Sequence, residues 1–176
     1  MPKSSKKQID EDEKKVIKEL QKNSKESIDK IAQNCGFSRQ KVWRIIKRLE
    51  NNQTIWGYHA VVDDDKLDLK KYLVLMKRSN KPILPEKLEL VTKGTLKNEI
   101  SKMGVDVDFN LYVHGEYDLI LCATTKDIKL MKKFCEKLNN VFNEYISDIK
   151  VLEVIFPISK SGFSNPKIET LREFFL

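Results

Sequence analysis

The sequence predicts an α+β protein: an N-terminal three-helix helix-turn-helix domain, joined by a strand and linker to a βαββαβ domain. Three observations predict this fold class. Apolar residues recur at helical spacing in the first third of the chain. Strand-like and helix-like segments alternate from residue 71 onward. The chain has 176 residues and a net charge of +7, of which residues 1–62 carry +6 and residues 63–176 only +1.

The first two helices have recognisable ends. Asp10 is a suitable N-cap for a first helix that runs to about residue 22, with Glu13 in the capping-box position. Ser27 then caps a shorter second helix. Gly36 follows as a C-cap that can adopt a positive φ. This arrangement predicts two short helices before a tight turn.

A third helix, capped by Ser38 and covering residues 39–52, has two different faces. One face is apolar and predicts core packing, while residues 39–48 include five basic side chains and no acidic one. A basic, outward-facing helix after a glycine-containing turn is typical of a recognition helix in the DNA major groove. The candidate DNA-binding residues are Ser38, Arg39, Gln40, Lys41, Trp43, Arg44, Lys47 and Arg48.

Within this helix, Val42, Ile45, Ile46 and Leu49 are expected to face the core, and Gln40, Trp43, Arg44 and Lys47 the opposite side. Lys41 and Arg48 lie on one flank, and Arg39 lies nearer the apolar arc. Arg, Lys and Gln can pair with base edges, and the remaining basic groups neutralise phosphates. Trp43 either contacts a thymine methyl group or packs on a neighbouring helix.

Residues 8–54 thus form the predicted DNA-binding domain, followed by a strand and linker over residues 55–70. Aromatic and β-branched residues predict the strand at 55–62. The second domain is expected over residues 71–158. Its predicted elements are a strand at 72–77, helical residues at 85–103 with an interruption at Gly94, strands at 109–113 and 117–125, a helix at 127–141 and a last strand at 149–158.

This order is that of a ferredoxin-like unit, with a tight hairpin turn at Gly115 and Glu116. Both sheet faces carry apolar residues, and two helices can cover only one of them. We therefore expect a homodimer at least. In the tail, residues 159–176, Asn165 and Pro166 predict the start of a short helix that docks on this chain or a neighbouring subunit.

Several function classes are excluded by composition. The longest apolar runs are far below the ~20 residues of a membrane helix, and the N-terminus lacks the apolar core of a secretion signal. Three cysteines without a CxxC pair and two histidines favour neither a disulfide framework nor a metal site. The sequence predicts a cytoplasmic protein without cofactor.

Two segments carry a resemblance to a known family. Residues 42–50, VWRIIKRLE, with the residues before and after them, resemble the DNA-binding half of the Lrp/AsnC, or feast/famine, transcriptional regulators. Residues 113–119, VHGEYDL, resemble the hairpin motif of that family's second domain. The resemblance covers about residues 8–158 and implies the same domain order.

The resemblance implies a dimer in which the strand at 55–62 pairs between subunits, and further assembly such as an octamer. It also implies a small effector, commonly an amino acid, bound near the hairpin. The residues carried over as effector-binding are His114, Gly115, Tyr117, Asp118 and Thr124.

The chain departs from the family in four places. Gln53 replaces a usual glycine, His114 replaces a small polar residue, the segment at 85–115 is longer, and the tail is extended. His114 is either a ligand or pH-sensitive group or a member of a cross-strand pair. Asp118 either binds an effector amine or holds the hairpin backbone.

Two other functions compete with a sequence-specific regulator. The charge of the first domain also fits an architectural protein that binds DNA with little sequence preference. Sirohaem decarboxylases share the two-domain layout but rely on histidines and arginines in the second domain. Here that domain has His114 alone, with Arg78 and Arg172, so the sequence predicts no enzyme.

Overall fold

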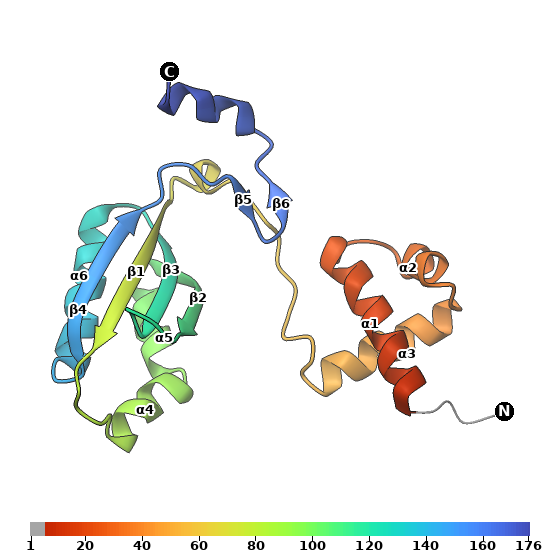
Figure 1. The fold of residues 1–176 in the computed structure, drawn as a ribbon, viewed down its shortest axis with the longest axis horizontal. Helices are drawn as coiled ribbons and strands as arrows, with labels where there is room; N and C mark the ends of the chain where they lie inside the picture. The colour runs from red at the N-terminus through yellow and green to blue at the C-terminus, as the bar shows by residue number, and fades with distance from the viewer. Residues whose placement is uncertain (1–5) are drawn as a thin grey trace. The chain divides into compact units, whose positions relative to one another are not determined.

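A computed structural model describes residues 6–176, which divide into two units (Figure 1). The helical unit ends at Val61 and also takes in Ser161–Phe163, and the α/β unit contains Val62–Lys160 and Ser164–Leu176. The helical unit contains α1 (Lys6–Lys22), α2 (Ile28–Cys35) and α3 (Arg39–Asn51). Its core consists of fully or almost fully buried apolar side chains from all three helices: Val16, Ile31, Ala32, Val42, Ile45 and Leu49. Each helix therefore buries one face, as the helical spacing predicts.

The capping predictions for α2 and α3 are confirmed. The Ser27 side chain accepts a hydrogen bond from the backbone N–H of Lys30, and the Ser38 side chain accepts one from that of Lys41. Gly36 has a φ of 69° at the end of α2, a conformation that favours glycine. These caps satisfy backbone groups at the helix ends and fix the turn before α3.

The predicted start of α1 is wrong. The helix begins at Lys6, so Asp10 lies inside it and is not an N-cap, and Glu13 has no capping role. Asp12 is instead buried, 2.6 Å from the Lys41 ammonium, and accepts a hydrogen bond of 3.0 Å from Gln8 Nε2. Burial raises the pKa of Asp12, but the hydrogen bonds from Lys41 and Gln8 outweigh this and leave the pKa below 3.8.

The end of α3 places a side chain in an unfavourable backbone conformation. Gln53 follows the C-cap Asn52 and has a φ of 60°, in the left-handed region. Its backbone N–H donates to the Glu50 carbonyl at 3.1 Å, and the N–H of Ile55 donates to the Leu49 carbonyl at 3.0 Å. The chain thus reverses as at a glycine C-cap, but without a glycine.

The segment at 55–62 is not a strand in the single chain. Residues 56–63 have no regular secondary structure, and Trp56 is 94% exposed. A strand requires a hydrogen-bonded neighbour, and none lies beside this segment within the described residues. The β-branched and aromatic residues favour a strand, but residues 55–62 do not form one in the single chain.

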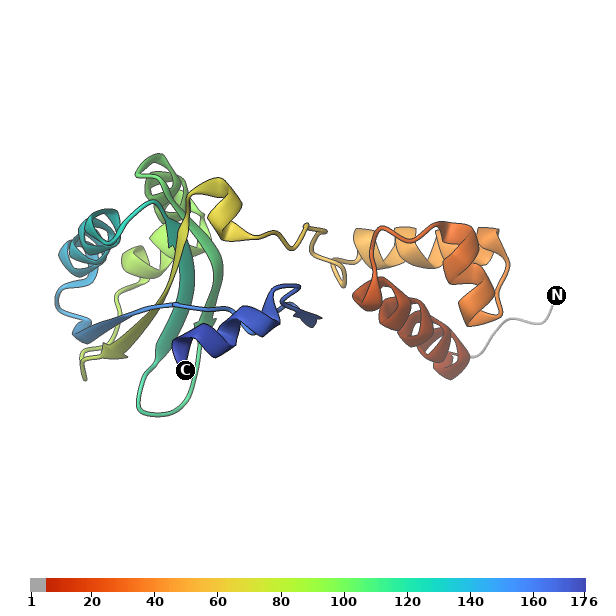
Figure 2. The ribbon, with the colours of Figure 1, turned by 90° about the horizontal axis from the view of Figure 1, so that it is seen from above.

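The α/β unit is built on an antiparallel sheet in the order β2-β3-β1-β4 (Figures 1 and 2). Its strands are β1 (Lys70–Arg78), β2 (Val105–Tyr112), β3 (Leu119–Thr125) and β4 (Ile146–Glu153). The helices are α4 (Pro85–Thr92), α5 (Thr95–Lys102) and α6 (Ile128–Phe142). The predicted interruption at Gly94, whose φ is 71°, separates α4 from α5.

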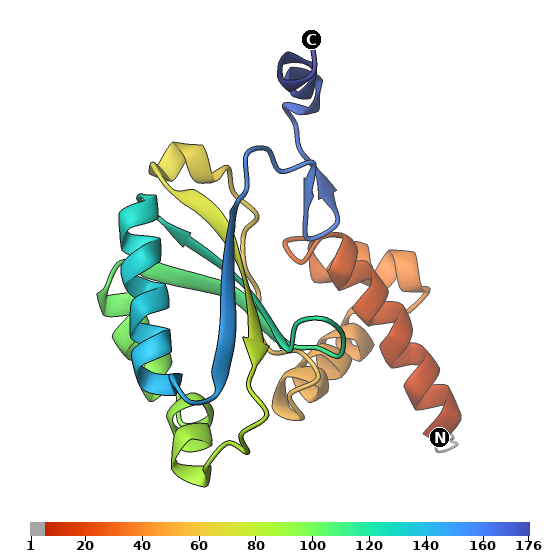
Figure 3. The same ribbon diagram turned by 60° about the vertical axis from the view of Figure 1, so that its left-hand side comes forward.

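One face of the sheet packs on helices and the other is open. Tyr72 and Val74 of β1 share a core with Ile100 of α5 and Phe134 of α6, so both helices cover the same face (Figure 3). On the opposite face, Leu73 of β1 pairs in register with Cys122 of β3 and with Leu152 of β4. Leu152 is 50% exposed, and Phe109 and Leu111 of β2 are also exposed. The predicted uncovered apolar face is therefore present.

Several boundaries in this unit differ from the predictions. The Gly115–Glu116 turn is part of a longer loop closed by the Val113 N–H, which donates to the Asp118 carbonyl at 2.8 Å. Strand β4 ends at Glu153, so residues 154–158 are not a strand, and Ile155 is 81% exposed. The apolar spacing of the helix predicted at 127–141 places Ile128 on its inward face, but the side chain is 39% exposed.

The tail contains a small hairpin of β5 (Ser159–Lys160) and β6 (Phe163–Ser164), then the 3-10 helix η2 (Ile168–Phe174). Asn165 Oδ1 accepts from the Lys167 backbone N–H at 2.8 Å, but the helix begins only at Ile168. The Phe174 ring lies 5.7 Å from the Phe156 ring. The tail therefore contacts its own chain, although by a 3-10 helix.

Charged side chains of the tail hold the beginning of the α/β unit, where a short 3-10 helix, η1 (Asp64–Leu67), precedes β1. The Lys160 ammonium lies 2.5 Å from Asp64 Oδ2 and donates to the Val62 carbonyl at 3.1 Å. Lys167 pairs with Asp63 at 2.7 Å. Lys71 of β1 contacts Asp64 at 3.5 Å. The end of the linker, the sheet and the tail thus share one ionic cluster.

Replacing Gln53 by glycine should stabilise the helical unit. Glycine avoids the left-handed penalty of about 1–2 kcal/mol but adds entropy to the unfolded chain, so Gln53→Gly should raise the free energy of unfolding by about 0.5–1 kcal/mol. Urea unfolding followed by tryptophan fluorescence suits the test, because both tryptophans, Trp43 and Trp56, precede residue 62. Asn52→Gly is the matched control: its φ is −89°, so the change should destabilise. Equal effects of both variants would contradict this account.

The Asp12–Lys41 pair should make the helical unit sensitive to acid. Since the folded-state pKa of Asp12 lies below 3.8, its contribution is complete above that pH and is lost as the pH falls toward the folded-state value. Asp12→Asn should lower the free energy of unfolding at pH 7 by about 1–2 kcal/mol, the value of a charge-assisted hydrogen bond. Urea titrations at pH 7 and pH 3 should show a smaller difference between wild type and variant at pH 3. A difference independent of pH would contradict the assignment.

Candidate nucleic-acid interface

The outward face of α3 is set by what the opposite face buries. Val42, Ile45 and Leu49 are at most 4% exposed, whereas Trp43 is 51% exposed. Gln40, Arg44 and Lys47 are also exposed. The structure therefore brings these four side chains to one solvent-facing surface, as the helical spacing predicts.

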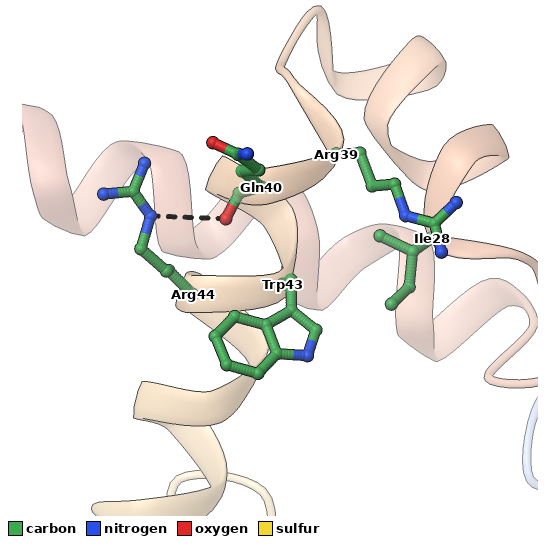
Figure 4. A pocket seen from close by; sticks show the side chains of 5 residues that line it. All are labelled: Ile28, Arg39, Gln40, Trp43 and Arg44. Atoms are coloured by element: carbon green, nitrogen blue, oxygen red, sulfur yellow. Dashed lines mark hydrogen bonds between the residues drawn. The ribbon is translucent and has the colours of Figure 1, made fainter.

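A hollow of about 510 Å³ lies on this surface. Its walls are Ile28 from the first turn of α2 and four residues of α3 (Figure 4): Arg39, Gln40, Trp43 and Arg44. Figure 4 shows the Trp43 indole between Arg44 on one side and Arg39 with Ile28 on the other. The Arg44 Nε donates to the Gln40 backbone carbonyl at 3.3 Å, which leaves the other guanidinium nitrogens directed away from the helix.

The basic residues on the outward face differ in their partners. Arg39 pairs with Asp29 at 2.7 Å, with both side chains more than 60% exposed. Lys47 pairs with Glu50 at 2.8 Å, and this hydrogen bond lowers the pKa of Glu50. Arg44 has no carboxylate partner among the described residues. Exposed pairs contribute only about 0–1 kcal/mol, so Arg39 and Lys47 can exchange their carboxylates for phosphates.

Lys41 and Arg48, which the sequence also predicts to contact DNA, have different partners from the other basic residues of α3. Lys41 pairs with the buried Asp12 and lies over the Phe37 ring, 3.9 Å from its centroid. Arg48 Nε pairs with Glu13 at 2.6 Å, and the Glu13 side chain is only 19% exposed. Both basic residues therefore connect α3 to α1. The Ser38 hydroxyl is likewise engaged, as the N-cap of α3.

Sequence reasoning missed the acidic partners and one wall of the hollow. From the sequence alone, Glu13 is assigned only a capping role and Asp12 none, although adjacent acidic residues on α1 could indicate partners for the basic flank of α3. Ile28 is half-buried, with part of its surface lining the hollow. A partly exposed isoleucine in the first turn of a helix has no distinguishing sequence signal.

The residues proposed for effector binding are not gathered at one place. His114, Gly115, Tyr117 and Asp118 lie on the loop between β2 and β3, whereas Thr124 is buried near the far end of β3. Six residues of extended chain separate Asp118 from Thr124, which is about 20 Å at ~3.3 Å per residue. Thr124 therefore does not share a site with the loop in this chain.

Within the loop, Asp118 has a structural role. Its Oδ2 accepts a hydrogen bond of 2.8 Å from the backbone N–H of Arg78, and its own N–H donates to the Met76 carbonyl at 3.0 Å. Lys150 lies 5.5 Å from the centroid of the Tyr117 ring. Gly115 does not adopt a positive φ, so the loop does not require glycine there. His114 is exposed.

The described part of the chain offers neither a metal site nor a membrane-spanning helix, and two of its thiols are poorly reactive. No group of three or more His, Cys, Asp or Glu residues there could hold a metal ion. Burial raises the pKa of both Cys122 and Cys135 to about 11, so these thiols are poor nucleophiles. No helix among residues 6–176 is both long and apolar enough to cross a membrane.

Comparison with known proteins identifies the helical unit as a DNA-binding domain. Residues 9–55 match the winged helix-turn-helix DNA-binding family. The HTH-type transcriptional regulator Ptr1 of Methanocaldococcus jannaschii is 30% identical over 131 residues, covering 73% of this chain and 81% of that protein.

Solved structures share the fold over nearly the whole chain. An AsnC family transcriptional regulator from Agrobacterium tumefaciens has a TM-score of 0.62 at 20% identity, covering 89% of this chain and 96% of that one. The feast or famine regulatory protein of M. tuberculosis, complexed with L-methionine, has a TM-score of 0.66 at 16% identity, covering 90% and 99%. From the helix-turn-helix, the following sheet domain and the identity to a named regulator, we conclude that this chain belongs to the Lrp/AsnC family of DNA-binding transcriptional regulators.

Proposed function

We propose that this DNA-binding regulator recognises a specific operator through the outward face of α3, and that an amino acid modulates its DNA affinity or its assembly. The observation that carries the first part is the position of Arg44. It is an exposed arginine at the centre of a recognition helix, with Gln40 and Trp43 beside it and no carboxylate partner among the described residues. The two terminal guanidinium nitrogens, which the hydrogen bond to the Gln40 carbonyl does not use, can donate to guanine O6 and N7.

The uncovered sheet face supports a homodimer, and assembly beyond it, such as an octamer, is part of the proposal. Phe109, Leu111 and Leu152 are 41–50% exposed on that face, and such apolar surface is usually covered by a partner. A twofold dimer presents two copies of α3. Its operator should then contain two half-sites separated by whole helical turns, about 34 Å each.

The effector proposal rests on the loop at 113–118 and on relatives. The M. tuberculosis protein and a Neisseria meningitidis transcriptional regulator were both solved with L-methionine. In this chain the loop offers the exposed His114 and the half-buried Tyr117. Because the Asp118 carboxylate is occupied by the Arg78 N–H, we assign ligand contact to His114 and Tyr117 and a scaffold role to Asp118.

Binding with low sequence preference is the second candidate. The charge of +6 on residues 1–62 favours it, because phosphate neutralisation alone gives non-specific affinity. The two candidates differ in the ratio of specific to non-specific affinity at fixed salt, which typically exceeds about 10³ for an operator-binding protein.

Removing the groove-facing polar groups should weaken operator binding selectively. On a duplex selected from a random library, Arg44→Ala should cost about 1–3 kcal/mol, and Gln40→Ala should add a further loss, while binding to unrelated DNA changes little. Fluorescence anisotropy measures both. Lys18→Ala is the matched control, since it removes the same charge from an exposed site on α1. If Arg44→Ala combined with Gln40→Ala bound the selected duplex like wild type, the assigned helix face would be wrong.

Lys47 should act through phosphate instead. Lys47→Ala should weaken binding to all duplexes alike and reduce the slope of log affinity against log salt by about 0.9. A sequence-selective loss without a change of slope would place Lys47 on a base edge.

An amino acid should stabilise the folded protein against heat. At a hundredfold excess over Kd, one bound ligand adds about 2.7 kcal/mol. Thermal unfolding with each of the twenty amino acids should therefore identify at least one that raises Tm. His114→Ala should remove this response, and Lys132→Ala, on the exposed surface of α6, should retain it. A response unaffected by His114→Ala would move the site away from the loop.

A further inference from the structure

The outward face of α3 carries one aromatic side chain that the packing of the helical unit does not use. The core is complete without Trp43, because Val42, Ile45 and Leu49 fill the inner face of the helix. The Trp43 side chain is 51% exposed, and its indole N–H makes no hydrogen bond within the described residues. So large an apolar surface beside charged groups is consistent with a contact made only in a complex.

The residues around Trp43 limit which chemical groups a partner can present to it. Arg39 and Arg44 lie on its two sides and Ile28 completes the hollow (Figure 4). A partner seated here must be anionic at its edges and must present an apolar group in the middle. A DNA major groove has this composition: phosphates line both rims, and thymine alone among the four bases presents a methyl group on the floor.

The hydrogen-bonding capacity of the Trp43 and Ile28 side chains is limited to one donor. The Trp43 indole has an N–H and no acceptor, so neither Trp43 nor Ile28 can accept a hydrogen bond from the amino group of cytosine or adenine. An apolar contact with the thymine C5-methyl group uses the surface that both residues present. It also disfavours cytosine, because the unmethylated C5–H buries less apolar surface in the hollow.

We propose that Trp43, supported by Ile28, reads the 5-methyl group of a thymine and is a specificity-determining residue of the operator complex. This inference rests on the proposed function, because it concerns the same helix face. It goes further by assigning a base and an atom group to one side chain. The operator half-site then contains a T·A pair adjacent to the pair contacted by Arg44.

The test is replacement of single thymines by deoxyuridine, which removes only the methyl group. The full chain is used to select duplexes from a random library, and each thymine of the enriched sequence is then replaced in turn. At one thymine per half-site, wild type should lose about fourfold in affinity, the effect of one buried methyl group. Trp43→Ala should bind more weakly and show no loss at that thymine, and Trp43→Phe should retain most of the loss.

Arg44→Ala is the control, because it should weaken binding to both duplexes while keeping their fourfold ratio. Circular dichroism checks that each variant keeps its helices, which we expect for changes at exposed positions. An enriched sequence with no deoxyuridine effect, or an effect that persists in Trp43→Ala, overturns the inference and leaves operator recognition standing. Failure to enrich any sequence overturns both.

Discussion

The burial of Val42, Ile45 and Leu49 between α1 and α2 determines which side of α3 meets solvent. Each such side chain contributes about 1.5–3 kcal/mol when fully buried, whereas an exposed ion pair contributes about 0–1 kcal/mol. The orientation of the helix is therefore fixed by apolar contact, and the charged groups on the other side do not have to hold it. That division leaves Arg39, Arg44 and Lys47 available for DNA.

The basic residues of α3 separate according to the burial of their partners. Asp29 is exposed, so Arg39 can leave it for a phosphate and both groups stay solvated. Asp12 is only 4% exposed, so removing Lys41 would leave a buried carboxylate unpaired, which is costly. Lys41 therefore stabilises the fold through Asp12, whereas Arg39 can exchange its carboxylate for a phosphate at little cost.

The elements that the sequence predicts well are determined by residues close to one another in the chain. Ser27, Gly36 and Ser38 act within one helical turn of themselves, so α2 and α3 are predictable from neighbouring residues alone. Asp10 is not a cap because α1 begins a turn earlier, at Lys6, and the partner of Asp12, Lys41, comes from another helix. The strand at 55–62 and the end of β4 depend on hydrogen-bonded neighbours, which residue preference does not reveal. In the site, the outward face followed from helical spacing, but the contribution of Ile28 required knowing how α2 approaches α3.

The extended tail gives the linker a defined end. Lys160 and Asp64 are both about 80% covered and lie 2.5 Å apart, and Lys167 adds a second pair with Asp63. Lys71 brings β1 into the same cluster. Because Asp64 is shared between a strand and the tail, withdrawing the tail would leave it with Lys71 alone at 3.5 Å. The tail and the sheet thus hold Asp64 at the beginning of the α/β unit. Residues 56–63, which have no regular secondary structure, end immediately before it.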